Sequence, residues 1–432
     1  MSRSVLIVSP HFPPINAADH QRVRMAIPYL PEYGWNPTVL AVAPEFVQAP
    51  RDEWLLRTLP ESLEVHRVGA LAVELTRRIG MSTLAFRCRR AMRLKGDELL
   101  ASGRFELVYF STTQVGVHRL GLRWKRKFGV PFVLDLQDPW VNDFYRLNPS
   151  VRPPGGRLKY AVAQIAARRD EPRCLRSASA VTTVSPRYID DVAGRSPGID
   201  RKKFHVLPFG ASGIDFDIAR QFPVPQSYIN FSDGLEHWVA VGRGGQDMRT
   251  ALEGLFRGFR QALQRDRPRF ERVRMHFLGT DYAAGDRAKE SVRPVAIREG
   301  VGDFVVEQPH RIPFSEALQC IVRSDLLLVM GSDDSGYNPS KVAPYLMSGR
   351  PLLAVLHAES PAAAVVQNVG GALVRFDQPG QQIADVVCET LLSNARQAAP
   401  QNNELTALSA RTMTEQLAAI FDFARMDSNE LR

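Results

Sequence analysis

The chain has few cysteines, no long apolar run and no cluster of residues with metal-ligand spacing. Its four cysteines, Cys88, Cys174, Cys320 and Cys388, lie far apart in 432 residues, which argues against a disulfide framework and a zinc site. No apolar run reaches the roughly 18 residues that a membrane-spanning helix needs. The apolar segment near the N-terminus is too short, before its prolines, for a secretory signal. We therefore expect a cytoplasmic protein without a metal site.

Internal repeats and low-complexity tracts are also absent, and 44% hydrophobic and 23% charged residues are typical of a soluble globular protein. The length is sufficient for two or three domains, each with its own core. The charge is unevenly distributed. Residues 1–205 hold 32 Lys and Arg against 19 Asp and Glu, a net +13, whereas residues 206–432 hold 23 against 27, a net −4. The first half is therefore suited to an anionic partner.

The densest basic segment is 75–96, LTRRIGMSTLAFRCRRAMRLKG, in which seven basic residues are interleaved with apolar ones. This pattern is typical of an amphipathic helix on anionic lipid headgroups, and it predicts peripheral attachment to the inner face of the cell membrane. The alternative is a solvated surface helix of an arginine-rich protein. No aromatic-interleaved platform supports nucleic-acid binding, so nucleic acid is not an expected partner.

Short β-rich apolar runs alternate with helix-length amphipathic segments along the chain. Segments 4–10, 21–35 and 36–44 read as strand, helix and strand, with Pro28 and Pro31 expected to shorten the helix. Further strands are predicted within 105–111, 129–140 and 178–186, and then within 237–245, 274–281, 303–309, 324–334 and 350–356. Such alternation predicts parallel sheets with helices on both faces.

The predicted fold class is α/β, with two doubly wound, Rossmann-like domains that face each other across a cleft. We place the first domain at 1–205, the second at 206–395, and a helical tail at 396–432 that packs back on the first domain. Ligands of such sheets bind outside the carboxyl ends of the strands. The functional residues are therefore expected in the loops that follow the strands.

The loop after the first strand of the second domain, within VGRGGQDMRT (241–250), holds three glycines and two arginines. Glycines allow a ligand to approach the backbone closely, and N–H groups at a helix start favour anions. The pattern is neither the P-loop nor the dinucleotide fingerprint, and a tight turn with solvated arginines is the alternative. The predicted phosphate-binding residues are Gly242, Arg243, Gly244, Gly245 and Arg249.

The loops after the next strands of this domain are polar as well. A helix should begin near residue 340, so Ser340 and Lys341 would offer a hydroxyl and an ammonium group to a diphosphate. A simple N-cap is the alternative for Ser340. The other candidates in these loops are Gly279, Thr280, Arg311, Asp333, Asp334 and Tyr337.

In the first domain, the proline-stiffened loop after the first strand contains Pro14 and Asn16, and Arg22 follows it. We assign these three residues to binding of a second substrate. Asp135 and Asp138 stand at the end of a predicted buried strand, where a carboxylate is costly unless it is hydrogen-bonded or used. Asp135, nearer the strand, is expected to be structural, and Asp138 to lie at the cleft.

Three histidines of the first domain, His11, His20 and His118, are candidates for a base. Isolated histidines are more often satisfied surface or core residues, so none of the three is assigned a role from the sequence.

The order and spacing of these segments resemble the GT-B glycosyltransferases, specifically glycosyltransferase family 4. The first matching piece is VLIVSPHFPP with the helix and strand that follow it. The others are FVLDLQDPW, SASAVTTVSP, VGRGG and NPSKVAPYLMSGRPLLAV. The resemblance implies the GT-B fold and transfer of a sugar, with retention, from a nucleoside diphosphate sugar on the second domain. The acceptor, a glycan, a lipid-linked molecule or another compound, would bind the first domain.

The family clamps the donor diphosphate with an arginine in a GR pair and a cation six residues on, which implies that role for Arg243 and Arg249. The resemblance implies catalytic roles for Arg243, Lys341 and Asp138, the last near the reacting sugar. The nucleotide sugar is then a co-substrate, and no metal is expected because cations stabilise the leaving group.

Two departures from the family pattern are apparent. Its paired glutamates would fall at Gly336 and Pro344, neither of which is acidic, so Asp333, Asp334 or Tyr337 would have to contact the sugar or ribose. The glycine-rich first loop is replaced by NAAD. These departures keep a degenerate protein that binds nucleotide sugar without catalysis as an alternative. A nucleotide-sugar epimerase of the same fold is another alternative, although it needs more acid and base residues.

Overall fold

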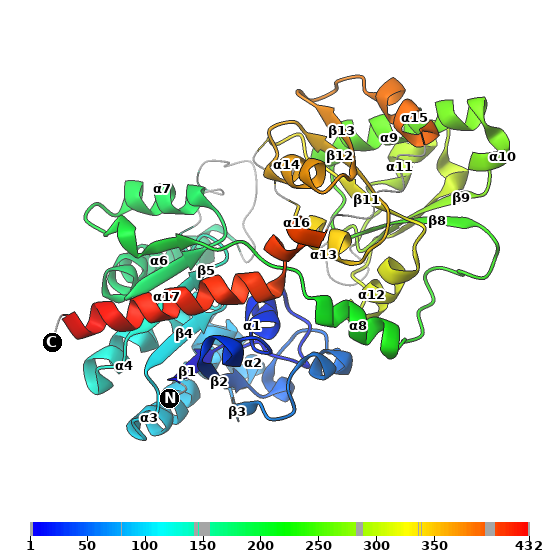
Figure 1. Cartoon of the computed structure of the whole chain (residues 1–432). Coiled ribbons are helices and arrows are strands. Elements are labelled where there is room, and N and C mark those ends of the chain that lie inside the picture. Colours follow the sequence, from blue (N-terminus) through cyan, green and yellow to red (C-terminus); the bar gives the residue numbers. More distant parts are fainter. Residues whose placement is uncertain are drawn as a thin grey trace. The chain divides into compact units, whose positions relative to one another are not determined.

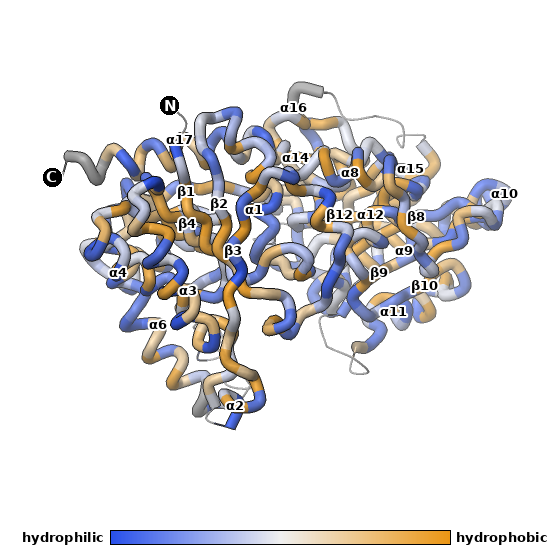
Figure 2. The backbone as a smooth tube through the Cα atoms, turned by 90° about the horizontal axis from the view of Figure 1, so that it is seen from below, coloured by the Kyte–Doolittle hydropathy of each residue, from blue (hydrophilic) through white to orange (hydrophobic). Residues whose placement is uncertain are grey.

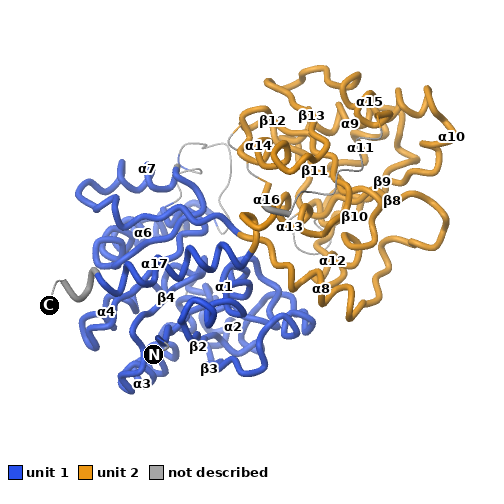
Figure 3. Tube along the Cα trace, in the orientation of Figure 1, with its two compact units in different colours: residues 1–209, 410–432 blue, residues 210–409 orange. Residues whose placement is uncertain are grey.

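The computed structural model describes residues 1–432 except 1–2, 79, 142–145, 147–155, 282–287, 336, 338, 394–401 and 431–432. The chain divides into two compact units (Figure 3). Unit 1 contains residues 1–209 and 410–432, and unit 2 contains residues 210–409. Each unit is built on one parallel sheet.

Unit 1 has a seven-stranded sheet in the order β3-β2-β1-β4-β5-β6-β7 (Figure 1). The strands are β1 (Arg3–Val8), β2 (Trp35–Val42), β3 (Glu64–Val68), β4 (Leu107–Ser111), β5 (Phe132–Leu136), β6 (Ala180–Thr183) and β7 (Phe204–Val206). The chain runs outward from β1 to β3 and then returns to pair β4 with β1. The loops after β1 and β4 therefore diverge at a topological switch point, where ligands of such sheets bind.

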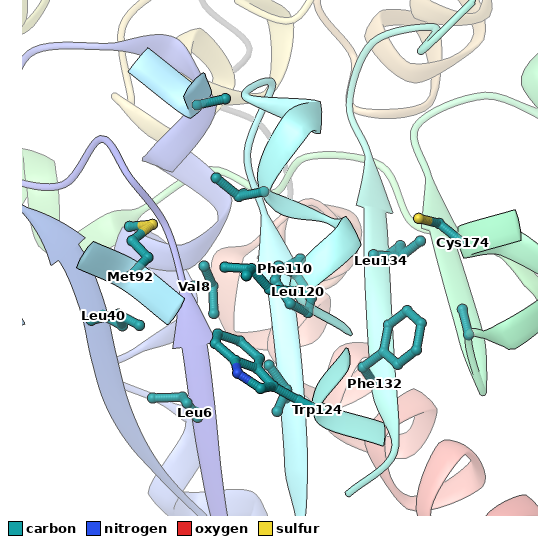
Figure 4. Close-up of a cluster of buried hydrophobic side chains, with 14 of the residues drawn as sticks. Leu6, Val8, Leu40, Met92, Phe110, Leu120, Trp124, Phe132, Leu134 and Cys174 are labelled. Atoms are coloured by element: carbon teal, nitrogen blue, oxygen red, sulfur yellow. The ribbon is translucent and has the colours of Figure 1, made fainter. Parts of the chain in front are cut away.

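Alternate residues of the central strands point to opposite faces of this sheet, as the two-residue period of a strand requires. On one face, Leu6 and Val8 pack with Met92, Leu120 and Trp124 (Figure 4). The helices that contribute to this face are α3 (Leu84–Ala101), α4 (Arg119–Phe128) and α6 (Arg157–Ser177). The short helix α2 (Val73–Arg78) precedes α3, and α7 (Pro186–Arg195) follows β6.

The opposite face is covered by α1 (Gln21–Ala26) and the C-terminal helix α17 (Ala410–Glu430). Phe421 of α17 packs edge-on against Trp35 and Tyr109, with ring centroids 5.4 Å and 5.0 Å away. The helix contacts β4, β5 and β6 (Figure 1). The predicted return of the C-terminal helix to the first sheet is confirmed. The helix after β1 ends at Ala26, before Pro28, as the two prolines predicted.

Unit 2 has a six-stranded sheet in the order β10-β9-β8-β11-β12-β13. The strands are β8 (Glu236–Val241), β9 (Val273–Leu278), β10 (Val305–Gln308), β11 (Leu326–Met330), β12 (Leu352–His357) and β13 (Ala372–Phe376). The helices are α8 (Gly213–Gln221), α9 (Arg249–Arg265), α10 (Arg267–Phe270), α11 (Arg293–Arg298), α12 (Phe314–Arg323), α13 (Val342–Met347), α14 (Pro361–Asn368), α15 (Ala384–Leu392) and α16 (Asn402–Ala407). The switch point here lies between β8 and β11. The predicted pair of doubly wound parallel sheets is confirmed.

The basic segment 75–96 spans the end of α2 and most of α3, with Ile79 outside the described residues. Four of its apolar residues belong to the core of unit 1: Leu84, Ala85, Cys88 and Met92. Arg87 is also buried, and its guanidinium donates to the carbonyl oxygens of Leu71 and Phe46, each at 2.9 Å. The buried residues of α3 cannot contact lipid, because α3 uses its apolar stripe to cover the sheet, and membrane attachment through this segment stays a prediction.

The four cysteines are free and buried, as small core residues are. Among the described helices, none is long and apolar enough to cross a membrane.

Candidate functional site

The glycine loop of unit 2 follows β8 at the switch point and leads into α9. Gly242 adopts φ +103°, a backbone region that favours glycine, and its amide donates to the Leu278 carbonyl at 2.8 Å. The Gly244 amide donates to the Thr280 carbonyl at 2.9 Å. A Cβ atom on Gly244 would lie 2.9 Å from both Ser291 Oγ and Val292 Cγ2, so glycine is required for close packing. These two amides donate to backbone carbonyls, so they are not free to bind an anion.

Two cations converge beside this loop. The Arg243 guanidinium is ion-paired with Asp247 and lies 5.4 Å from the centre of the Tyr337 ring. The Lys341 side chain packs against Gly242. A Cβ atom added to Gly242 would lie 3.7 Å from Lys341 Nζ. Burial, and then the charge of Arg243, lower the pKa of Lys341 to about 8. Within the described parts of the chain, Lys341 has no carboxylate partner, so the pair carries positive charge suited to a diphosphate.

Asp247 is a site residue that the sequence did not reveal. Its Oδ2 accepts hydrogen bonds from Arg243 and from Ser332 Oγ, the latter at 2.8 Å, and its carbonyl accepts from the Asp333 amide at 2.6 Å. Asp247 thus links the loop after β8 to the loop after β11. The sequence offered one signal for this role, an acidic residue four positions after Arg243. The other partner of Asp247, Ser332, lies 85 residues further along the chain.

Arg249, the second cation of the predicted clamp, lies at the start of α9. Its side chain is 62% exposed, and it is ion-paired with Glu253 at 2.5 Å. Lys341, in contrast, is buried close enough to Arg243 for the charge of the arginine to lower its pKa. A donor-clamp role for Arg249 stays a prediction, and it would require the Glu253 pair to open.

The remaining donor-site candidates of unit 2 lie on the same sheet edge. Gly279, at φ +72°, follows β9, and the buried Thr280 hydroxyl donates to Glu307 at 2.5 Å. Glu307 also accepts hydrogen bonds from the backbone amides of Ser291, Val292 and Arg293, at the start of α11. Thr280 therefore helps to hold the carboxylate that fixes this loop. Arg311, Asp334 and Ser340 are exposed, Asp333 and Gly245 are partly exposed, and Gly336 is outside the described residues. Ser340 is not the N-cap of α13, since that position is Lys341.

At the edge of the unit 1 sheet, the structure makes Arg22 a buried structural residue. Its side chain and that of Asp135 are both 0% exposed, and Nε lies 3.0 Å from Asp135 Oδ2. The remaining guanidinium nitrogens donate to the carbonyls of Leu207 and Pro208, at 2.8 Å and 3.2 Å. The guanidinium of Arg22 thus makes its hydrogen bonds within unit 1, and its acceptor role stays a prediction. Asp135 is structural, as expected.

The other first-domain candidates differ in their access to solvent. Pro14 and Asn16 are buried, and their backbones pair with Asp52 and Pro50, at 2.7 Å and 2.8 Å. Their acceptor role stays a prediction. Asp138 follows β5, and the residue as a whole is exposed. Its carboxyl group is nevertheless partly desolvated, and this desolvation, followed by the charge of nearby Asp19, raises the pKa of Asp138.

His20 and His118 are fully buried, and burial lowers the pKa of each to about 4. A base in contact with substrate must reach it, so neither histidine is suited to that role. No group of three or more His, Cys, Asp or Glu side chains in the described residues could hold a metal ion.

Two doubly wound sheets with a returning C-terminal helix define the GT-B class of fold. Residues 20–210 match the family model described as "Glycosyl transferase 4-like domain". Most of the sequence of unit 1 is therefore similar to this domain, and the resemblance read from the sequence is confirmed. No curated protein matches the chain by sequence.

Solved structures of low sequence identity share the fold over nearly the whole chain. Anabaena HepE, in complex with UDP and glucose, is 15% identical with a TM-score of 0.56 and covers 97% of this chain and 99% of its own. A UDP-forming trehalose-phosphate synthase from Burkholderia xenovorans is 15% identical, with a TM-score of 0.53, over 98% and 99% of the two chains. A putative UDP-N-acetylglucosamine 2-epimerase from Listeria monocytogenes is 10% identical, with a TM-score of 0.51, over 98% and 96%. These likenesses establish the fold.

Proposed function

We propose that this protein transfers a sugar from a UDP-sugar to a hydroxyl acceptor, with retention at the anomeric carbon. The observation that carries the proposal is the convergence of Arg243 and Lys341 beside the glycine loop, since a pair of cations stabilises the charge that develops on a departing diphosphate. UDP is the nucleotide named for HepE and for the trehalose-phosphate synthase, which supports it as the base to test first. Unit 2 holds the donor, and unit 1 holds the acceptor.

Calorimetric titration with UDP, UDP-glucose, GDP and dTDP, followed by measurement of nucleotide release, tests this function. We expect UDP and UDP-glucose to bind and UDP to be released from the sugar nucleotide. Binding without release, across a panel of glycan and lipid-linked acceptors, would instead support a degenerate binding protein. Conversion of UDP-sugar into its epimer would support an epimerase. Failure of any nucleotide to bind would overturn the proposal.

The affinity for UDP should depend on the protonation of Lys341. Below its pKa of about 8 the side chain is an ammonium ion that attracts the diphosphate, and above that value it becomes neutral. The Kd of UDP is therefore expected to rise between pH 7 and pH 9, by up to about tenfold per pH unit above 8, because one proton is linked to binding. Titration calorimetry at pH 7, 8 and 9 measures this rise.

The Lys341→Met variant is the control for this pH dependence. It should bind UDP more weakly than the wild type at pH 7, with a Kd that changes little up to pH 9. A wild-type Kd that is constant over this range would remove Lys341 from the diphosphate site.

We also propose that unit 1 binds anionic membrane, where a lipid-linked acceptor would be presented. The surface that supports this is α2 and its flanks, where Leu71, Leu75 and Met81 are 54%, 63% and 48% exposed beside the exposed Arg77 and Arg78. Figure 2 shows α2 at the tip of a projection of unit 1. Exposed apolar side chains flanked by arginines fit the headgroup region of a bilayer.

In liposome co-sedimentation at low salt, the wild type should pellet with anionic vesicles. Replacement of Arg77, Arg78 and Arg90, the last an exposed residue of α3 in the same basic segment, by Gln should release it. Each such residue contributes about 1 kcal/mol near an anionic surface. The matched control replaces Arg126, Arg201 and Lys202, which are exposed elsewhere on unit 1, with the same loss of charge. Wild-type protein that stays in the supernatant would point to a soluble acceptor.

A further inference from the structure

The Arg243 guanidinium is held by one of its three nitrogens. Its Nη2 donates to Asp247 Oδ2, and within the described residues Nε and Nη1 make no hydrogen bond. The guanidinium carbon lies 5.4 Å from the centre of the Tyr337 ring. A guanidinium presents five N–H donors in a rigid fork. Arg243 therefore keeps donors that an anion could bind while its pair with Asp247 stays intact.

The Asp247 carboxylate is in turn fixed by the loop after β11. Ser332 Oγ donates to Asp247 Oδ2 at 2.8 Å, and the same hydroxyl oxygen accepts from the Asp334 amide at 3.1 Å. An ionised carboxylate cannot donate, so the hydroxyl proton of Ser332 must point to Asp247. Ser332 is only 2% exposed. The direction of the carboxylate is therefore determined by a buried hydroxyl group and not by solvent.

The glycine loop leaves room for this carboxylate. A Cβ atom added to Gly245 would lie 2.6 Å from Asp247 Oδ1, which is closer than a Cβ atom approaches any other atom in practice. A side chain at position 245 would therefore push the carboxylate away from Arg243. Gly244 is required for a different reason, its packing against Ser291 and Val292, so the third glycine of the loop has a purpose of its own.

Arg243 and Lys341 repel each other in the absence of an anion. Burial, and then the charge of Arg243, lower the pKa of Lys341. An arginine side chain has many rotamers, and without a partner the guanidinium would turn away from the ammonium ion. Asp247 is the carboxylate that pairs with Arg243 within the described residues. It keeps the two cations together, so less rotamer freedom is lost when an anion binds.

We propose that Asp247 is a positioning residue, which holds Arg243 in the arrangement that binds the donor diphosphate; this rests on the proposed transfer from a UDP-sugar. The contacts run from Ser332 through Asp247 to Arg243. The diphosphate oxygens bind the remaining N–H groups of Arg243 and the Lys341 ammonium group, while Asp247 stays paired with Nη2. A carboxylate that instead competed with the diphosphate for the guanidinium would have the opposite effect on affinity.

Titration calorimetry with UDP at pH 7 measures the effect on affinity. Asp247→Ala should raise the Kd of UDP about tenfold, which is the lower end of the cost of removing a residue that orients a ligand-binding group. Ser332→Ala should raise it less, because Arg243 still pairs with Asp247. The Asp247 side chain is 41% exposed, so the variant should fold, and thermal unfolding checks this. A Kd at or below the wild-type value in Asp247→Ala would show a competing carboxylate and overturn the proposal.

A double-mutant cycle separates this positioning role from a general structural role. If Asp247 acts through Arg243, Asp247→Ala should change the Kd of UDP by less than about twofold in the Arg243→Ala background. An equal loss of affinity in both backgrounds would overturn the proposal. Glu271→Ala is the matched control, because Glu271 lies four residues after Arg267 and pairs with it, at 3.5 Å, on an exposed part of unit 2. That variant should bind UDP as the wild type does.

Nitrogen NMR of the arginine side chains tests the pair without any nucleotide. In the ligand-free wild type, the Nε–H group of Arg243, assigned by its loss in Arg243→Ala, should be restrained on the nanosecond timescale. In Asp247→Ala it should approach the mobility of Arg267, whose side chain is 79% exposed. A mobile Arg243 in the wild type, or no change in Asp247→Ala, would overturn the proposal. A wild type that binds no UDP would instead overturn the proposed function, while the NMR measurement still reads the pair.

Discussion

Replacing Arg243 by alanine should lower kcat/KM for the UDP-sugar by about 10²–10³-fold, a loss of about 2–4 kcal/mol of transition-state stabilisation. The guanidinium lies in the glycine loop beside Lys341, and its charge would act on the diphosphate as the bond to the sugar breaks. The fold should remain intact. The Arg243 side chain is 32% exposed, and Asp247 keeps its hydrogen bond from Ser332 after the change.

Steady-state kinetics with UDP-glucose, together with thermal unfolding, measure both parts of this prediction. Arg265→Ala is the matched control, because Arg265 is an exposed arginine paired with Glu389 at the far end of α9. That variant should retain wild-type kinetics. Normal turnover by Arg243→Ala would remove the arginine from the transition state, and a large fall in its unfolding temperature would show a structural role.

Replacing Arg22 by methionine should destabilise unit 1 by about 3–5 kcal/mol, because it leaves the buried Asp135 carboxylate without its cationic partner. Ser111, Gln137 and Thr182 would still donate to Asp135, at 2.8–2.9 Å, but they carry no charge. Two carbonyls that accept from Arg22 would also lose their donors. Unfolding in urea, or calorimetry, should show this loss directly.

Two further variants test whether the unpaired Asp135 charge causes this loss of stability. The double variant Arg22→Met with Asp135→Asn should recover a substantial part of the stability, since the uncompensated charge is removed. Arg104→Met breaks an exposed pair with Glu64 and should cost less than about 1 kcal/mol. Near-wild-type stability of Arg22→Met, with weaker binding of an acceptor, would support the acceptor role that the sequence predicted.

Local patterns were sufficient to predict two parallel sheets and the glycine loop, but not the outer strands β3, β7 and β13. Short apolar runs that alternate with amphipathic segments are determined by the periods of strands and helices, which do not depend on distant residues. Prolines and glycines mark the turns for equally local reasons. The segment 241–245 could therefore be placed at the end of a strand before any tertiary contact was known, and β8 ends at Val241.

Tertiary structure decided which charged groups meet. Lys341 reaches Gly242 because β8 and β11 are neighbours in the sheet, an order that crosses over the sequence. Arg22 meets Asp135 across 113 residues, and Asp19 is held by threonines more than 90 residues away. Whether an arginine such as Arg87 covers a core or faces solvent likewise depends on what packs beside it. Charge and hydrogen bonding act between groups that are close in space, so a sequence supplies the groups, and only the strand order brings them together.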